Sequence, residues 1–224
     1  LALIIEEGFP IRQLEKILDS VAEVLGELGV ALVAGDTKVM GKGELDGIVI
    51  NTTGIGVAAQ PVTDAGLSPG DLLLVTGPVG DHGFALLLAR EELPLETELR
   101  SDVAPLWPLL APVLETGGVT AMKDPTRGGL AAALNELARK SQVGIEVWEE
   151  KIPVRKEVRG LAELLGISPY EMACEGRAVL GVRPEKAEEI LNLLRAHPLG
   201  EGACLIGQAL DAYPGRVILA TEVG

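Results

Sequence analysis

The sequence predicts a mixed α/β (α+β) chain of two domains, and three observations support this prediction. Short apolar runs, typical of buried strands, alternate with longer segments whose apolar residues recur every three or four positions, as in helices that cover a sheet. Residues 61–70 are rich in turn formers and interrupt this alternation. The 224 residues are enough for two modest hydrophobic cores. We therefore expect one domain over residues 1–62 and a second over residues 63–224.

The first domain begins with an apolar run at residues 1–5, which predicts a buried strand. Pro10 then opens a helix that Gly29 ends, and its apolar stripe consists of Ile11, Leu14, Ile17, Leu18, Val21, Leu25 and Leu28. Further strands are expected at residues 30–34 and 48–59. Because the first and last of these strands carry apolar residues on both faces, we expect a homodimer formed through this domain.

The second domain repeats the alternation of strands and helices. Strands are expected at residues 72–75, 119–122, 145–148, 178–182, 203–210 and 217–220. Helices are expected at residues 84–90, 103–115, 129–140 and 184–196. This order predicts a second mixed α/β unit.

Composition and charge exclude several classes of protein. The formal net charge of −14 argues against nucleic-acid binding, which needs a basic face. No apolar stretch is long enough to span a membrane, and no signal peptide is apparent. The two cysteines, Cys174 and Cys204, form no CxxC pair and are expected to be small buried hydrophobes in a cytoplasmic protein.

Asp36, Thr37 and Lys38 form the first candidate site. They follow the strand expected at residues 30–34, and ligands commonly bind beyond the carboxyl ends of strands in α/β sheets. A carboxylate, a hydroxyl and an ammonium suit Mg²⁺ together with a polyphosphate. The alternative is that Asp36 only fills a turn, and the residue types alone favour that alternative.

A second candidate site is the segment of residues 123–129. Asp124, Thr126 and Arg127 supply a carboxylate, a hydroxyl and a guanidinium, and two glycines follow at the start of a predicted helix. The free N–H groups of a helix N-terminus favour anions. The alternative is an ordinary capped helix with Asp124 or Thr126 as the cap.

Glu175 is a candidate general base because it stands beside Gly176 just before a predicted strand, where glycine leaves room for a substrate. The alternative is a local ion pair with Arg177, and without further context the ion pair is favoured. The glycine-rich segment of residues 77–83 lacks the ending of a P-loop. We expect it to be a tight strand–helix turn capped by Asp81.

Several short motifs are spread over the whole chain, and their order along the sequence resembles that of a known protein family. They are Gly35-Asp36-Thr37-Lys38-Val39, Gly80-Asp81-His82-Gly83, Ser101-Asp102 with Ala104-Pro105-Leu106, Asp124-Pro125-Thr126-Arg127-Gly128-Gly129, Ile152-Pro153-Val154-Arg155, Glu175-Gly176 and Ile206-Gly207. Together they resemble the HypE family of hydrogenase maturation proteins, in the superfamily of aminoimidazole ribonucleotide synthetase, thiamine-phosphate kinase and selenophosphate synthetase. Gly-Asp-His-Gly combined with the later Ser-Asp motif is what points to HypE.

This resemblance implies a two-domain PurM-like architecture, with an N-terminal dimerising α/β domain that is partial here and a C-terminal α/β domain. It implies ATP-dependent dehydration of a C-terminal cysteine S-carboxamide to a thiocyanate, which supplies cyanide ligands for the iron centre of NiFe-hydrogenase. Asp36 and Asp124 would serve Mg²⁺ and ATP, with Thr37, Thr126 and Arg127 as further nucleotide contacts. Lys38 would stabilise developing charge, and Glu175 would take the amide proton. The implied partners are the carbamoyltransferase HypF and the HypC–HypD complex.

Three departures from the family pattern limit these expectations. The upstream aspartate-bearing segment and the C-terminal cysteine tail would lie outside residues 1–224, and Cys174 stands where the family usually has asparagine. We therefore expect this chain alone to be inactive in self-cyanation. Two rival interpretations remain open: a small-molecule kinase resembling thiamine-phosphate kinase, and a non-catalytic scaffold for hydrogenase assembly.

Overall fold

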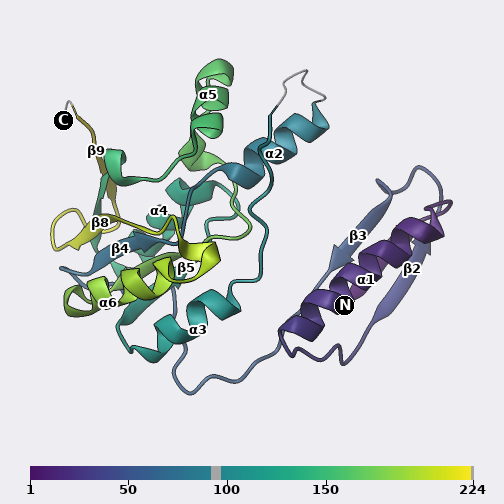
Figure 1. Cartoon of the computed structure of the whole chain (residues 1–224), viewed down its shortest axis with the longest axis horizontal. Helices are drawn as coiled ribbons and strands as arrows, with labels where there is room; N and C mark the ends of the chain where they lie inside the picture. Colours follow the sequence, from purple (N-terminus) through teal and green to yellow (C-terminus); the bar gives the residue numbers. More distant parts are fainter. Residues whose placement is uncertain (92–96, 223–224) are drawn as a thin grey trace. The chain divides into compact units, whose positions relative to one another are not determined.

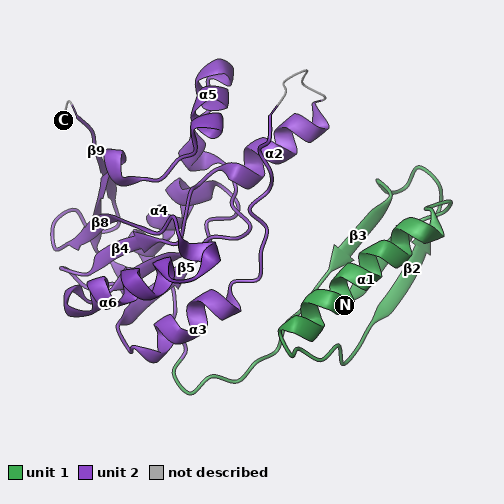
Figure 2. Cartoon of the chain, in the orientation of Figure 1, with its two compact units in different colours: residues 1–60 green, residues 61–224 purple. Residues whose placement is uncertain are grey.

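The computed structural model describes residues 1–91 and 97–222 and has the expected mixed α/β fold (Figure 1). The chain forms two compact units, Leu1–Gln60 and Pro61–Gly224, here called unit 1 and unit 2 (Figure 2). Each unit has its own sheet, so each is described separately.

Unit 1 is a small sheet covered by one helix. Its elements are β1 (Ala2–Glu6), α1 (Ile11–Glu27), β2 (Asp36–Met40) and β3 (Ile48–Asn51), and the strand order is β2-β1-β3. β1 runs parallel to β2 and antiparallel to β3. Leu3 and Ile5 of β1 are buried, and the half-buried stripe of α1 consists of Leu14, Ile17, Val21, Leu25 and Leu28. The predicted helix is thus confirmed, except that Ile11 and Leu18 are exposed.

Two strand predictions in unit 1 are wrong. Residues 30–34 form no strand, and the chain pairs with β1 only from Asp36 onward. The apolar run instead belongs to the connection from α1 to a strand parallel with β1, and this connection must cross from one end of the sheet to the other. The strand expected at residues 48–59 ends at Asn51, because only residues 48–51 find a partner on β1.

Unit 2 contains a six-stranded sheet of order β5-β7-β4-β8-β6-β9. The strands are β4 (Leu72–Val75), β5 (Val119–Lys123), β6 (Gly144–Trp148), β7 (Val179–Val182), β8 (Cys204–Leu210) and β9 (Val217–Ala220). Neighbours are antiparallel except β6 and β9, which are parallel. All six predicted strands are therefore present, with ends that differ by at most one residue.

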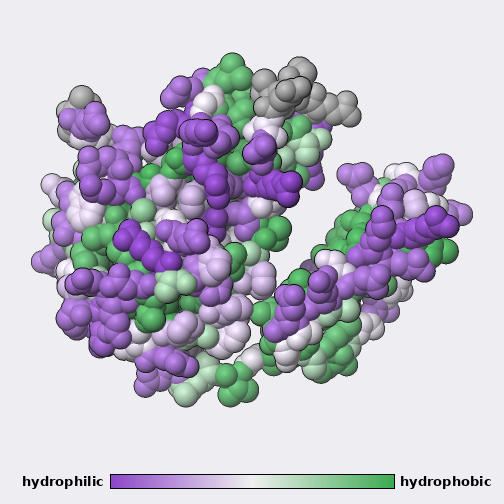
Figure 3. Space-filling view, in the orientation of Figure 1, coloured by the Kyte–Doolittle hydropathy of each residue, from purple (hydrophilic) through white to green (hydrophobic). Residues whose placement is uncertain are grey.

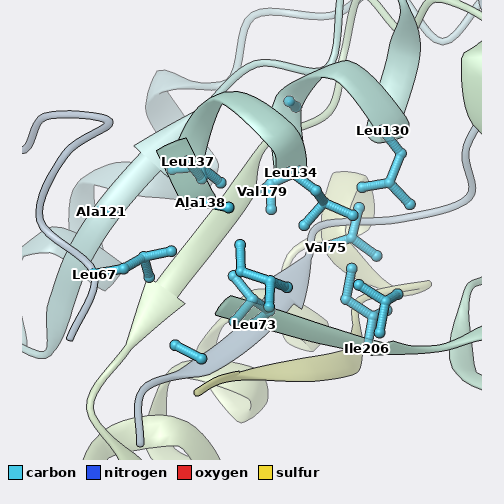
Figure 4. Close-up of a cluster of buried hydrophobic side chains, with 14 of the residues drawn as sticks. Leu67, Leu73, Val75, Ala121, Leu130, Leu134, Leu137, Ala138, Val179 and Ile206 are labelled. Atoms are coloured by element: carbon cyan, nitrogen blue, oxygen red, sulfur yellow. The ribbon is translucent and has the colours of Figure 1, made fainter. Parts of the chain in front are cut away.

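Helices cover both faces of this sheet. The helices are α2 (Asp81–Arg90), α3 (Trp107–Glu115), α4 (Gly129–Ser141), α5 (Lys156–Leu165) and α6 (Pro184–Arg195). Side chains alternate along a strand, so Leu73 and Val75 of β4 pack under α4 (Figure 4). Leu74, between them, points to the opposite face and packs with α3 and α6. The core of unit 2 is thus two apolar layers, one on each side of the sheet.

A smaller apolar cluster joins α2 and α5 around the fully buried Phe84. The sequence prediction did not include α5. The described residues of the unit also form three single-turn 3-10 helices: η1 (Glu149–Lys151), η2 (Pro169–Glu171) and η3 (Pro198–Gly200). Among the residues described, no helix is both long and apolar enough to cross a membrane.

Candidate functional site

The candidate residues of unit 2 gather at one end of the six-stranded sheet. Val75, the last residue of β4, pairs with Val179 at the start of β7 and with Cys204 at the start of β8. Lys123, the last residue of β5, also pairs with Val179. Because these strands are antiparallel, the loops after β4 and β5 and the loops before β7 and β8 all leave the sheet at this end. Asp124 and Glu175 lie in two of those loops.

The loop after β5 presents polar groups to solvent in front of α4. Thr126 Oγ donates a hydrogen bond to Asp124 Oδ2 at 3.0 Å, and Asp124 remains largely exposed. Gly128 and Gly129 have φ of +76° and +60°, a backbone conformation that favours glycine. Gly128 is the N-cap residue of α4 and no side chain caps this helix. The capping role considered for Asp124 and Thr126 is therefore not observed; the two side chains instead bond to each other, and Lys123 Nζ lies 3.8 Å from Asp124 Oδ1.

Glu175 lies directly beside this loop. The backbone N–H of Cys174 donates to Pro125 O at 3.0 Å. A Cβ on Gly129 would overlap backbone atoms of residues 170–172, so only glycine lets the two loops approach this closely. The Glu175 side chain is exposed. The structure thus brings the candidate base next to the Asp124 loop, although the two are far apart in sequence.

Arg177 does not pair with Glu175, as the local alternative supposed, but with Asp102. Its Nε lies 3.6 Å from Asp102 Oδ2, which is an ion pair too long for a hydrogen bond. The guanidinium, only 9% exposed, donates from Nε to Pro78 O and from one terminal nitrogen to Gly176 O and Leu199 O. Asp102, whose side chain is fully buried, accepts a hydrogen bond from the backbone N–H of Glu175 at 3.0 Å.

Asp81 belongs to the same buried neighbourhood and does not cap α2. It is the first residue of the helix, is 2% exposed, and its Oδ2 accepts a 2.7 Å hydrogen bond from Arg155 Nε. Burial raises the pKa of the Asp81 carboxyl, whereas the Arg155 guanidinium opposes this rise. The adjacent His82 places its Nδ1 2.8 Å from Ser101 Oγ, which ties α2 to the segment that carries Asp102.

Two cavities flank the Arg177–Asp102 pair. The first is about 290 Å³ in volume and is lined by Asp81, Asp102, Arg155 and Arg177, among others. The second is about 280 Å³; its charged lining includes Asp64, Lys123 and Asp124, and its apolar lining includes Leu106, Leu110 and Met122. Arg177 lines both cavities. Unit 2 therefore offers recesses of small-molecule size beside the candidate residues.

Unit 1 carries the other candidates, Asp36, Thr37 and Lys38, which are all exposed on β2. The position predicted for Asp36 is wrong, because it is the first residue of a strand and does not lie beyond the carboxyl end of one. Alternation along β2 and its register with β1 place Asp36 and Lys38 on the face opposite the buried Leu3, which is the face free of α1. Thr37 lies on the other face, and its N–H donates to Asp36 Oδ1 at 2.8 Å.

No preformed metal centre is present in the described part of the chain, and one of the two thiols, that of Cys174, is held in its unreactive form. No three His, Cys, Asp or Glu residues cluster there as a metal site. The residues that could join a hard cation are the exposed carboxylates of Asp36 and Asp124, which would need further oxygens from water or phosphate. Cys174 is fully buried, and burial raises the pKa of its thiol to about 12.

Sequence reasoning missed the roles of Asp81, Asp102 and Arg177. Asp81 was expected to be a cap, Arg177 a local partner of Glu175, and Asp102 was noted only as part of a motif. A signal for these positions was present in the sequence. Three of the family motifs contribute residues to this one network: Gly80-Asp81-His82-Gly83, Ser101-Asp102 and Ile152-Pro153-Val154-Arg155.

Comparison with known proteins identifies the domains. Residues 1–58 match the family model of the AIR synthase related protein, N-terminal domain, and residues 68–220 match that of the C-terminal domain. The chain is 47% identical to a putative hydrogenase expression/formation protein of Methanocaldococcus jannaschii and 45% identical to carbamoyl dehydratase HypE of Rhizobium leguminosarum bv. viciae. The match covers the whole chain in both cases, and 67% and 65% of the two relatives. The chain thus spans about two thirds of the length of these curated relatives.

Solved structures agree with these matches. A crystal structure of a HypE–HypF complex aligns over the whole chain and 73% of its own, with a TM-score of 0.95 and 43% identity. A HypE structure in complex with ATP aligns over the whole chain and 69% of its own, with a TM-score of 0.91 and 35% identity. A thiamine monophosphate kinase of Aquifex aeolicus is similar in fold alone, with a TM-score of 0.69 over 97% of this chain and 72% of its own, and with 18% identity.

Proposed function

Because the chain belongs to the HypE family of AIR synthase related proteins, we propose that it is the main part of an ATP-dependent carbamoyl dehydratase. The reaction converts the S-carboxamide of a C-terminal cysteine to a thiocyanate that supplies cyanide for the iron centre of NiFe-hydrogenase. One observation supports this most directly: the 3.0 Å bond from Cys174 N to Pro125 O joins the loop of an exposed carboxylate, Asp124, to the loop of a candidate base, Glu175.

The chemistry explains why both kinds of residue are needed. An amide oxygen is a poor leaving group, and transfer of the γ-phosphoryl group of ATP to that oxygen makes it a good one. The C–O bond then breaks, the amide nitrogen loses both of its protons, and the products are the thiocyanate, ADP, phosphate and a proton. A group that removes protons from nitrogen and groups that hold phosphate charge are therefore required.

The exposed polar groups fit Mg²⁺ and a polyphosphate. Mg²⁺ is usually held by one or two carboxylates together with phosphate oxygens and water, which suits the isolated carboxylates of Asp36 and Asp124. When bound, Mg²⁺–ATP supplies the phosphoryl group. Thr37 and the exposed Arg127 are available as hydrogen-bond donors to phosphate oxygens, and Thr126 becomes a donor to phosphate if its hydroxyl turns away from Asp124.

We assign charge stabilisation to Lys38 and proton removal to Glu175. Lys38 is exposed and shares a face of β2 with Asp36, so its ammonium can reach the charge that develops on a phosphorylated oxygen. Glu175 is exposed, and its backbone is anchored by Asp102, which lets the carboxylate point toward a substrate. The substrate cysteine is neither Cys174, which is fully buried, nor Cys204, which lies within β8.

The proposed partners follow from the family and from the surface of unit 1. Apolar side chains lie at that surface beside the polar side of α1 (Figure 3), and Val49, which pairs with Ile4 on the face free of α1, is 43% exposed. Such a surface suits a homodimer formed through unit 1. A HypE relative is known in a complex with HypF, and we propose the same carbamoyl donor here, the HypC–HypD complex as acceptor, and a cytoplasmic setting.

Replacing Glu175 by glutamine in the complete protein tests the proposal. A positioned base contributes about 10²–10⁴-fold, so thiocyanate formation in a single turnover should slow by that factor while ATP still binds. Mass spectrometry of the carbamoylated cysteine measures the loss of water. Glu171→Gln is the matched control, because Glu171 is a neighbouring exposed acid in η2 and should have no effect. A slowing of less than about tenfold by Glu175→Gln would remove the base from this position.

A further inference from the structure

We propose that Asp102 is a positioning residue for Glu175, which it holds in place through the backbone of the segment of residues 174–177. This inference rests on the proposed function of Glu175 as a base. Asp102 touches no substrate and acts only through Glu175. Three features support this role: the contacts between Asp102 and residues 174–177, the contacts that hold Asp102 itself, and the burial of its carboxylate.

Asp102 directly contacts the segment of residues 174–177, here called the base segment. Asp102 Oδ1 accepts the backbone N–H of Glu175 at 3.0 Å. The next residue, Gly176, packs its Cα so closely against the backbone oxygen of Asp102 that any Cβ would overlap it. The segment therefore touches Asp102 on both its side chain and its backbone, and only glycine fits at position 176.

Arg177 closes the other end of the segment. It pairs with Asp102 Oδ2 at 3.6 Å and donates to Pro78 O at 3.0 Å, which lies just beyond β4. Its bond to Gly176 O at 3.1 Å turns back on the segment itself. Glu175 thus stands between two anchors, its own N–H on Asp102 and the buried guanidinium two residues later.

Asp102 is itself held by a rigid element. Ser101 Oγ lies 2.8 Å from His82 Nδ1 and accepts the N–H of Val103 at 3.1 Å. His82 is in the first turn of α2, where Asp81 is fixed by Arg155. Contacts therefore connect α2 to the backbone of Glu175: His82 contacts Ser101, and the next residue, Asp102, accepts the N–H of Glu175.

Electrostatic stabilisation alone does not account for this buried network, because burying charges is costly and apolar residues often fill such a space as well. In the described residues, Asp102 Oδ2 and Asp81 Oδ1 are buried and accept no hydrogen bond. The buried carboxylate of Asp102 does fix the backbone at Glu175. This matters for the reaction, because a small displacement of a reacting group can lower the rate by about 10²-fold.

The test compares two substitutions of Asp102 in the complete protein. Asp102→Ala removes the acceptor for Glu175 N–H and should slow single-turnover thiocyanate formation by about 10²-fold without weakening ATP binding. Asp102→Asn keeps an oxygen acceptor and should stay within about tenfold of the wild type. The matched control is Asp71→Ala: Asp71 is also buried and accepts a backbone N–H, from Ser68 at 2.8 Å, but it lies before β4, away from Glu175. Asp71→Ala should destabilise unit 2 and leave the rate unchanged.

Two further measurements separate positioning from a general loss of structure. In a Glu175→Gln background, Asp102→Ala should cause no further slowing, because its effect passes only through Glu175. Amide hydrogen exchange at Glu175 should be faster by about tenfold or more in Asp102→Ala and near wild type in Asp102→Asn. The exchange result does not depend on activity, so a wild-type protein that makes no thiocyanate would refute the proposed function and leave the anchor itself tested.

Three outcomes would overturn the inference. They are unchanged exchange at Glu175 in Asp102→Ala, an equal slowing by Asp71→Ala, and an additive slowing when Asp102→Ala is combined with Glu175→Gln. If Asp102→Ala does not fold, Ser101→Ala serves in its place, because it removes the acceptor for Val103 N–H and the partner of His82. It should loosen residues 101–103 and slow the reaction in the same direction, and an unchanged rate would count against the inference.

Discussion

Replacing Arg177 by methionine removes the buried cation at the centre of the candidate site. The guanidinium donates hydrogen bonds to Pro78 O, Gly176 O and Leu199 O, and it pairs with Asp102. Methionine can fill the space of the aliphatic stem but supplies no donor. The substitution therefore leaves three backbone carbonyls and one buried carboxylate without their partner.

The expected loss of stability follows from these contacts. A hydrogen bond from a charged donor contributes about 1.5–3 kcal/mol, and breaking one side of a buried ion pair costs about 3–5 kcal/mol. These contributions overlap, because Asp102 and the carbonyls can take up water once the segment loosens. We expect a loss of about 4 kcal/mol in the free energy of unfolding of unit 2. That is a large part of the roughly 5–15 kcal/mol that stabilises a typical domain.

Tryptophan fluorescence during urea unfolding measures this loss without interference from unit 1. Both tryptophans of the sequence, Trp107 and Trp148, lie in unit 2. Arg195→Met is the matched control: Arg195 also donates to a backbone carbonyl, Ala203 O at 2.9 Å, but it is exposed, and its loss should cost no more than about 1 kcal/mol. A loss below about 1 kcal/mol in Arg177→Met would refute the assignment of Arg177 as a structural anchor.

Two further predictions concern Cys174 and unit 1. With a pKa of about 12, Cys174 is only about 10⁻⁴ thiolate at pH 8, so iodoacetamide should label Cys204 first in the native protein, as peptide mass spectrometry can show. Equal labelling of both cysteines would contradict the burial of the Cys174 thiol. Because the thiol ionises near the ordinary pKa of 9.0 only in the unfolded protein, Cys174 should also lower the free energy of unfolding by up to about 1.4 kcal/mol per pH unit between pH 9 and 12. Sedimentation should show a dimer in the complete protein that Val49→Asp weakens and Val24→Asp, on α1, does not. A monomeric wild type at micromolar concentration would speak against the homodimer.

The elements of unit 2 could largely be predicted because its strands have local patterns. β4 is a continuous apolar run between turn residues, and the structure confirms both of its ends, Leu72 and Val75. α5 escaped prediction although Val158, Leu161 and Ala162 lie on one buried face. Its apolar stripe is short, and Gly160 interrupts it, so local propensity argued against a helix that packing with α2 stabilises.

Unit 1 shows the opposite relation between pattern and structure. Residues 30–34 are entirely apolar, yet they are exposed and form no strand. Asp36, Thr37 and Lys38 are polar, yet they pair with β1. Hydrogen bonding to β1 decides the outcome here, and this long-range pairing is not visible in local composition.

Individual residues of the candidate site could be predicted from the sequence, but the contacts between them could not. Asp124 and Glu175 were identified by the residue types around them. The bond between Asp102 and Glu175 spans 73 positions, and the sequence suggested the nearer Arg177 as the partner of Glu175. Only the fold shows that Arg177 turns inward to Asp102 and leaves Glu175 facing solvent.

The position of Glu175 beside the Asp124 loop depends finally on the register of the sheet. Val179 pairs with both Val75 and Lys123, and this pairing sets the point at which the two loops leave the sheet. A shift by one residue would turn Val75 from the α4 layer to the opposite face, so the apolar packing on both faces opposes any such shift. The hydrophobic core thus fixes the strand ends, and the Asp102–Arg177 network then fixes the loop between them. Asp102→Ala, which removes the anchor of Glu175 and leaves the core intact, should therefore reduce activity more than stability, whereas Arg177→Met and core substitutions should reduce both together.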